Sequence, residues 1–179
     1  MKRKSEIFNF TILSVITVFI LGTLFHFTFN WSNMNTIIGS FSAVNESTWE
    51  HLKLLFFPML ITSIIGNFYL TSYTSSFLCA RISAIFSSIL FTIVFFYTYT
   101  GILGFNIAIL DIATFYIATI IGECISYKIM ISNFNCNNKN FFLIFALIFL
   151  SFILFTFFPP KVGLFKDPLT GTYGISKTF

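Results

Sequence analysis

Charged residues are scarce in this chain of 179 residues. Only 9% of the residues are charged, 56% are hydrophobic, and the mean hydropathy is +0.90. Soluble domains typically contain about 25% charged residues. The composition therefore excludes an ordinary soluble protein and predicts one integral membrane domain over residues 1–179, with the lipid bilayer as its main partner. The chain also lacks a Lys- or Arg-rich stripe with interleaved aromatic residues, which excludes a nucleic-acid partner.

Familiar signatures of catalysis and cofactor binding are missing as well. The sequence has no Gly-x-Ser-x-Gly, no phosphate-binding P-loop and no Cys-x-x-Cys pattern. There are only three cysteines, Cys79, Cys124 and Cys136, and each lies near a helix end that we predict to be cytoplasmic, where thiols are expected to be reduced. The sequence therefore names no cofactor and does not decide whether the protein is an enzyme.

What the chain has instead is a series of five apolar runs. A helix needs about 20 residues to cross the hydrocarbon of a bilayer, and these runs reach or approach that length. The predicted spans cover approximately residues 7–29, 49–70, 78–100, 107–127 and 141–158. Residues 159–179 form a short, turn-rich tail, because Pro159 and Pro160 end the last helix. The expected fold class is all-α, a polytopic membrane helix bundle of about five transmembrane helices.

The cationic residues predict the orientation of the bundle. Positive side chains favour the cytoplasmic side of a membrane. With the N-terminus in the cytoplasm, that side receives Lys2, Arg3, Lys4, Arg81, Lys128 and Lys139. The tail then lies outside together with Lys161, Lys166 and Lys177, which runs against the rule. The first run is too long for the apolar part of a signal peptide, so we expect it to be an uncleaved span.

The densest group of polar residues is Asn45–Lys53, which we call the polar island. Ser47 and Glu50 have the spacing of a capping box, in which each side chain satisfies a free amide at the start of a helix. Glu46 adds negative charge near the positive end of the helix dipole. Capping explains these three residues, but it gives His51 no role.

Ionisable residues from other predicted spans reach the same level as the polar island. An acid inside a span costs about 2.5–3.5 kcal/mol on insertion scales, so Asp111 needs a partner such as a histidine or a lysine. Glu50 and Lys53 lie three residues apart on one helix face and can also form an ion pair. We predict one outward-facing polar pocket, formed by His26, Glu46, Glu50, His51, Lys53, Tyr97, Tyr99 and Asp111.

Two chemistries are open to this set of residues. Two histidines with up to three carboxylates have the donor types of a site for zinc or another divalent metal. However, Glu50-His51 is not part of a His-Glu-x-x-His helix, and no pair of histidines has ligand spacing, so the sequence assigns no metal. The alternative is a pocket that couples to protons or cations, because acids and histidines change charge during such a cycle.

A second ionisable group lies deeper in the predicted bundle. Glu123 is 12 residues past Asp111, roughly 18 Å along a helix axis, and so belongs to the inner third of the membrane. Arg81 and Lys128 reach the same level from the cytoplasmic side. We predict a structural ion pair between Arg81 and Glu123, and an inner relay station for protons is the alternative.

Three segments resemble a known family. They are the sequence from Val44 to Pro58, the sequence from Tyr97 to Gly104, and the stretch from Phe158 to Gly174. Together they are similar to the domain-of-unknown-function 6512 family of small bacterial membrane proteins. The resemblance covers nearly the whole chain and implies a multi-pass protein of the bacterial plasma membrane. It carries over no functional residue.

These observations leave three functions open. The first is binding or transport of a small ligand or ion, which for transport would need a homodimer, because the sequence shows no internal repeat. The second is a membrane-embedded enzyme that uses acid–base groups or a metal on a lipid-linked substrate. The third is a non-catalytic membrane scaffold or sensor. A cavity that extends toward Glu123 favours transport, and one that opens sideways to lipid favours the enzyme.

Overall fold

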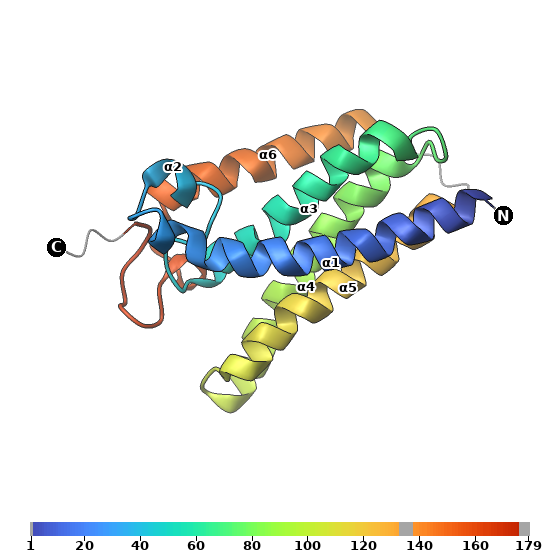
Figure 1. Cartoon of the computed structure of the whole chain (residues 1–179). Coiled ribbons are helices and arrows are strands. Elements are labelled where there is room, and N and C mark those ends of the chain that lie inside the picture. The colour runs from blue at the N-terminus through green and yellow to red at the C-terminus, as the bar shows by residue number, and fades with distance from the viewer. Residues whose placement is uncertain (1, 133–137, 176–179) are drawn as a thin grey trace.

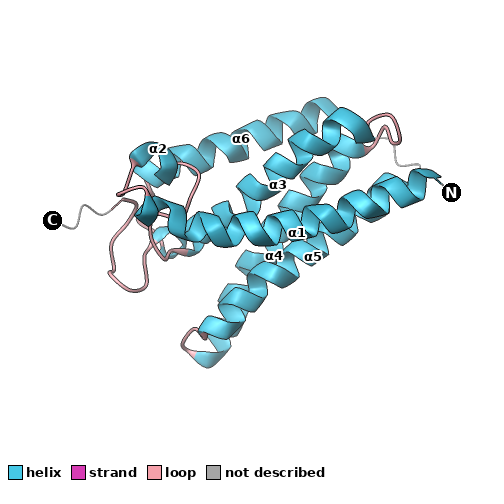
Figure 2. Cartoon of the chain, viewed as in Figure 1, coloured by secondary structure: helices cyan, strands magenta, loops and turns pink. Residues whose placement is uncertain are grey.

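The computed structural model describes residues 2–132 and 138–175. These residues form helices and no strand, apart from one isolated antiparallel bridge between Lys166 and Tyr173. The helices are α1 (Lys2–Trp31), α2 (Thr36–Gly39), α3 (Thr48–Leu70), α4 (Phe77–Leu103), α5 (Ala108–Ile131), α6 (Asn138–Phe157) and the short 3-10 helix η1 (Gly163–Phe165). Figure 2 shows how the loops gather at the ends of the helices.

Membrane-spanning character follows from the length and composition of the helices. Within the described part of the chain, α1, α3, α4 and α5 are each long and apolar enough to cross a membrane, and α6 contributes a shorter apolar helix over Phe142–Phe157. Each predicted span overlaps one of these five helices. The expected fold class is therefore confirmed: the protein is all-helical, with helices suited to a membrane bundle.

Local sequence explains where the helices begin and end. Ser47 is the N-cap of α3, and its hydroxyl accepts a hydrogen bond from the backbone N–H of Glu50 at 3.4 Å. The capping box is only half formed, because the Glu50 carboxylate points elsewhere. Helix α4 ends at Gly104, which adopts a left-handed conformation (φ +80°) and donates its N–H to the Thr100 carbonyl. This turn allows α5 to run back against α4.

The long helices pack as a bundle with one divergent hairpin. In Figure 1, α3 lies between α1 and α6, while α4 and α5 run together and cross α1 and α3 at an angle. The tip of the α4–α5 hairpin lies away from the end of the bundle where α1 ends and α3 begins. We call that end the island end. The C-terminal tail lies there as well, and the start of α1 lies at the opposite end.

An apolar layer fills the middle of the bundle. Its buried members come from α1, α3, α4 and α6, and they are Val18, Leu52, Phe56, Phe57, Met59, Ala84, Ile85 and Phe152. A second buried cluster, toward the opposite end, includes Ile7, Phe10, Leu70, Phe77, Ala80 and Met130. Dispersion and close packing hold such helices together, since lipid is as apolar as the side chains.

The cysteines differ from the expectation of reduced thiols. Cys124 is free, but Cys79 is disulfide-bonded, so the expectation is wrong for Cys79. Cys136 and Lys177 lie outside the described residues, as does the side chain of Lys139. Cys79 lies near the start of α4, at the end of the bundle where α1 starts and α5 ends, and disulfides are rare in a reducing cytoplasm. Which end faces the cytoplasm therefore stays a prediction, made from the cationic residues alone.

Candidate functional site

Three helices meet closely at Gly22 of α1. A Cβ atom added to Gly22 would lie 2.5 Å from Cζ of Phe115 on α5 and 2.7 Å from the backbone oxygen of Leu54 on α3. Only glycine permits this approach, as is common where helices cross in membranes. About one helical turn from each of these three residues along its own helix lie His26 on α1, His51 on α3 and Asp111 on α5.

His26, Glu46 and His51 form a compact group, which we call the His–Glu cluster. Nε2 of His51 lies 3.3 Å from Nε2 of His26 and 3.3 Å from Oε2 of Glu46. Nε2 of His26 lies 3.7 Å from the same Glu46 oxygen. The three side chains are 30–40% exposed, so the cluster is accessible from the island end. Three ligand atoms from three separate segments therefore converge on one point.

The tautomer of His51 follows from its other ring nitrogen. Nδ1 lies 3.0 Å from the backbone carbonyl of Ser47, and a carbonyl only accepts hydrogen bonds. Nδ1 must therefore carry a proton. When His51 is neutral, its Nε2 has a lone pair, and that lone pair faces His26 and Glu46.

The two histidines shift the acidity of Glu46, which lies in the loop before α3. Hydrogen bonding to His26, and to His51 when its ring is protonated, holds the pKa of the Glu46 carboxyl well below its usual range, although partial burial opposes this shift. Glu46 is therefore ionised at neutral pH. With both imidazoles neutral, the His–Glu cluster carries one negative charge.

Glu50 and Lys53 lie apart from this cluster and form a buried ion pair. Nζ of Lys53 lies 2.5 Å from Oε2 of Glu50, and both side chains are almost inaccessible. Lys53 also donates to the Gly39 carbonyl at 2.7 Å and to Oγ1 of Thr156 on α6 at 2.9 Å. The pair thus connects α3 to the last residue of α2 and to the last long helix.

The same interactions fix the loop that carries Glu46. Oε2 of Glu50 accepts a hydrogen bond from the backbone N–H of Val44 at 3.0 Å. The side-chain amide of Asn45 donates to the Gly174 carbonyl in the tail at 2.9 Å. Glu46 is therefore held between two anchored neighbours and the N-cap of α3, which limits the conformations available to its carboxylate.

Asp111 finds its partners on its own hairpin. Its carboxylate accepts hydrogen bonds from the hydroxyl of Tyr99 and from the side-chain amide of Asn106, the latter at 2.9 Å. The charge of Asp111 acts on His51 through space, without a hydrogen bond between the two side chains. Tyr97 is 42% exposed and packs edge-on against Phe96. The eight candidates thus divide into the His–Glu cluster, the Glu50–Lys53 pair and the Tyr99–Asp111 pair, with Tyr97 apart.

Arg81 and Glu123 meet in the other half of the bundle. Nη1 of Arg81 lies 2.6 Å from Oε2 of Glu123, and both side chains are buried. Hydroxyl groups complete the network: Arg81 also donates to Ser14, Thr62, Ser63 and Ser126, and Ser14 donates to Glu123 at 2.7 Å. Four helices therefore share one network, in which the guanidinium and the carboxylate both have partners.

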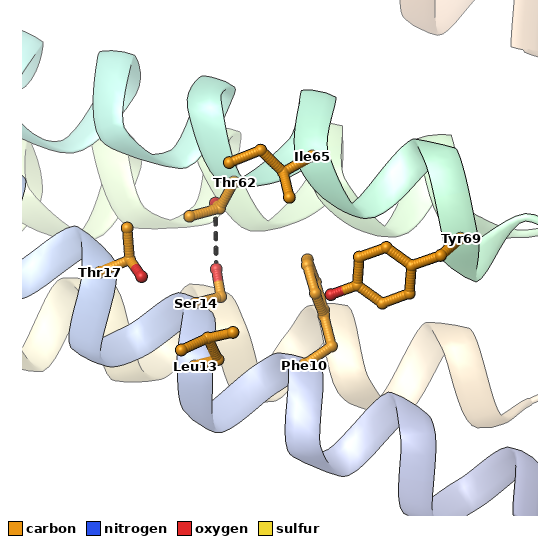
Figure 3. A pocket seen from close by; sticks show the side chains of 7 residues that line it. All are labelled: Phe10, Leu13, Ser14, Thr17, Thr62, Ile65 and Tyr69. Atoms are coloured by element: carbon orange, nitrogen blue, oxygen red, sulfur yellow. Dashed lines mark hydrogen bonds between the residues drawn. The ribbon is translucent and has the colours of Figure 1, made fainter.

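A small cavity adjoins this network. It lies between α1 and α3, has a volume of about 50 Å³, and is lined mainly by apolar side chains together with Ser14, Thr17 and Thr62 (Figure 3). Ser14 and Thr62 also contact Arg81. This cavity lies on the far side of the apolar layer from the His–Glu cluster, since Val18 separates Ser14 from His26 along α1.

Sequence reasoning missed the residues that position the sites. The hydroxyl partners of Arg81 come from three helices, and isolated Ser and Thr residues in apolar runs give no signal of what they contact. Gly22 gave a stronger signal, because a glycine inside a transmembrane run often marks a close helix crossing. Thr156 gave none.

The fold and the sites define a class: a helical membrane protein with buried ion pairs in its interior and an accessible His–Glu cluster at one end. Residues 1–175 match the family of unknown function DUF6512, so the chain belongs to that family, as the three segments of the sequence indicated. No curated protein matches the chain, and no solved structure matches it.

Proposed function

We propose that this protein binds a cation at the His–Glu cluster, on the outer face of the bacterial plasma membrane. One observation carries the proposal: Nε2 of His51 lies 3.3 Å from a carboxylate oxygen of Glu46. Because Nδ1 of His51 holds the proton, a neutral His51 places a lone pair against that oxygen. An N–H of His26 can be donated to His51 or to Glu46. In either case the contact between Nε2 of His51 and the Glu46 carboxylate remains a contact between two hydrogen-bond acceptors.

A positive charge between these atoms removes the repulsion. In the absence of a metal or other cation, a second proton on His51 supplies that charge and forms an ion pair with Glu46. A bound cation supplies it without that proton. The proposed site therefore alternates between a protonated state and a cation-bound state, and cation affinity should fall as the pH falls.

The surroundings favour binding over transport. The His–Glu cluster is accessible, whereas the Glu50–Lys53 and Arg81–Glu123 pairs are buried and hydrogen-bonded within the protein. Between the cluster and Arg81 lies the apolar layer, with Phe56 and Met59 fully buried. A path for ions through this layer would need the helices to move apart. Binding at the cluster needs neither that movement nor a second copy of the chain.

Thermal unfolding in detergent tests the proposal. The purified protein is stripped of metals with a chelator and is then heated with Na⁺, K⁺, Mg²⁺, Ca²⁺, Mn²⁺ or Zn²⁺, with the fluorescence of Trp31 and Trp49 as the signal. A ligand present at 100 times its dissociation constant stabilises the folded state by about 2.7 kcal/mol. At least one cation should raise the midpoint of the wild type.

Two variants locate the effect. Glu46→Gln removes the carboxylate charge of the cluster and should abolish the stabilisation by the cation. Glu6→Gln removes a carboxylate at the opposite end of α1 and should leave the stabilisation unchanged. The proposal fails if no cation stabilises the wild type, or if the same cation stabilises Glu46→Gln equally.

A further inference from the structure

We infer that the cation is a transition-metal ion of the zinc class, held by Nε2 of His26, Nε2 of His51 and Oε2 of Glu46. This inference rests on the proposed function and names its ligand. The three atoms are mutually close enough to bind one ion, and their residues come from α1, the loop before α3, and α3.

The donor types select the class of metal. Imidazole nitrogen is a favourable ligand for Zn²⁺, Cu²⁺, Fe²⁺ and Ni²⁺. Mg²⁺ and Ca²⁺ prefer sites made entirely of oxygen ligands and water. A group with two imidazole nitrogens and one carboxylate oxygen therefore suits transition metals better than the cations of the alkali and alkaline-earth series.

The spacing of the donors fits one tetrahedral ion. Zinc binds imidazole nitrogen at about 2.0–2.1 Å and carboxylate oxygen at about 2.0–2.2 Å, which places two ligands of a tetrahedron roughly 3.3–3.5 Å apart. The three separations in the His–Glu cluster are 3.3, 3.3 and 3.7 Å. A small rotation of the half-exposed Glu46 side chain shortens the longest one. Little rearrangement is therefore needed to admit the ion.

The outer contacts of His51 provide a second, independent observation. A histidine that binds a metal usually donates its other ring N–H to a carbonyl or a carboxylate, which fixes its tautomer and its orientation. His51 donates Nδ1–H to the Ser47 carbonyl in this way. The contact therefore orients the ring so that Nε2 of a neutral His51 presents its lone pair to His26 and Glu46.

Three protein ligands leave one position of a tetrahedral ion open. Zinc sites with a closed set of four protein ligands are structural, whereas two histidines with one glutamate and a water form the composition of several catalytic sites. Asp111 does not complete the set, because Tyr99 and Asn106 already bind its carboxylate. The bound metal thus keeps one position for water or for an exchangeable ligand.

Metal titration of the full-length protein in detergent tests the inference. After removal of metal with a chelator, Zn²⁺ binding is measured by elemental analysis after gel filtration, and Co²⁺ binding by visible absorption, which reports the number and geometry of the ligands. The wild type and Glu6→Gln should bind one ion per chain, with an absorption band typical of four- or five-coordinate Co²⁺.

Removal of a ligand should weaken this binding strongly. Loss of an outer contact costs about 10- to 100-fold in metal affinity, so loss of a direct ligand should cost more than about 100-fold. Glu46→Gln, His26→Ala and His51→Ala each test one ligand. Glu46→Gln has nearly the same shape as the wild type, and gel filtration with thermal unfolding shows for each variant whether it is folded.

The outcomes separate this inference from the proposed function. If Na⁺ or Ca²⁺ stabilises the wild type through Glu46 while Zn²⁺ and Co²⁺ do not bind, the transition-metal inference is overturned and cation binding stands. If Zn²⁺ binds equally to the wild type and to folded Glu46→Gln, the His–Glu cluster is not its site. If no cation of any kind binds, both conclusions fail together.

Discussion

His26 and His51 lie 25 residues apart on different helices, yet their Nε2 atoms are 3.3 Å from each other. Between neutral imidazoles this contact needs either a proton on Nε2 of His26, donated to His51, or a cation that both nitrogens bind. The crossing of α1 and α3 at Gly22 brings the two rings together, and the loop before α3 adds Glu46. The geometry of the cluster thus depends on packing deeper in the bundle as well as on its own residues.

The carboxylate of Glu46 should make stability depend on pH. His26 and His51 hold the pKa of this group below its usual range in the folded state. Its contribution to stability is therefore complete above the ordinary pKa of an unfolded glutamate, about 4.3, and is lost as the pH falls through the lower folded-state value. Two further charged groups interact electrostatically with His51 of the cluster, Asp111 from α5 and Glu50 from α3.

Thermal unfolding of the metal-free wild type and of Glu46→Gln between pH 7 and pH 3 measures this effect. The wild type should unfold at the higher temperature at pH 7, and the difference should narrow below about pH 4. A difference that stays constant down to pH 3 would mean that the ionised carboxylate of Glu46 does not stabilise the folded protein.

The close crossing at Gly22 should not tolerate a side chain. A Cβ at this position would lie 2.5 Å from Phe115 and 2.7 Å from the Leu54 carbonyl, so Gly22→Ala forces the helices apart. Overpacking of this kind typically destabilises by about 1–3 kcal/mol. Because His26 lies one turn away, the variant should also bind the cation more weakly.

Gly101 offers a matched control in α4. No atom lies within 4 Å of a Cβ built there, so Gly101→Ala should leave stability unchanged or raise it by up to about 1 kcal/mol. Thermal unfolding in detergent compares the two variants. Equal effects of Gly22→Ala and Gly101→Ala would contradict the tight crossing.

The number and level of the helices could be predicted from the sequence, but the direction of the side chains could not. Long apolar runs identify spans, and counting residues along each run places His26, His51 and Asp111 at similar depths. The face that each residue occupies depends on how its helix is rotated. Helices surrounded by lipid are apolar on most sides, so periodicity gives little indication of that rotation.

Tyr97 and Tyr99 illustrate this limit. Two residues apart on a helix, they point to widely different directions, and the structure directs Tyr99 to Asp111 while Tyr97 remains exposed. The pair of Glu50 and Lys53 was easier to anticipate, since a spacing of three residues places both on one face. Its burial was not evident from the sequence, because it depends on Thr156 of α6 and on Gly39 at the end of α2.

The hydroxyl network around Arg81 should contribute to stability beyond the ion pair itself. Oγ1 of Thr62 is buried, accepts a hydrogen bond from Arg81 at 2.9 Å and lies 3.0 Å from Oγ of Ser14, whose one hydroxyl proton is donated to Glu123. Thr62→Val keeps the shape of the side chain but leaves the buried Arg81 guanidinium with one partner fewer, which should destabilise by about 1–3 kcal/mol.

Thr23→Val is the control for that substitution. Thr23 is exposed, and its hydroxyl donates only to the Phe19 carbonyl of its own helix, so the change should alter stability by less than about 0.5 kcal/mol. Unfolding of both variants in the same detergent gives the comparison. If Thr62→Val proves as stable as Thr23→Val, the network is not a determinant of stability.

Lys53 should affect the His–Glu cluster although it does not touch it. Its ammonium group holds Glu50 and the Gly39 carbonyl, and Glu50 in turn holds the backbone at Val44, two residues before Glu46. Lys53→Met leaves the buried carboxylate without a counter-charge, which should destabilise the protein by about 3–5 kcal/mol. Folded Lys53→Met should also bind the cation more weakly, because the Glu46 loop loses its anchors.

The double variant Glu50→Gln/Lys53→Met separates the two effects. It removes both charges, so it should be more stable than Lys53→Met alone. Its cation affinity should nevertheless stay below that of the wild type, since the anchors at Gly39 and Val44 are lost or weakened. Stability comes from thermal unfolding, and affinity from titration of the folded fraction at the same temperature. An affinity restored to the wild-type value along with stability would show that the ion pair acts only on folding and does not position Glu46.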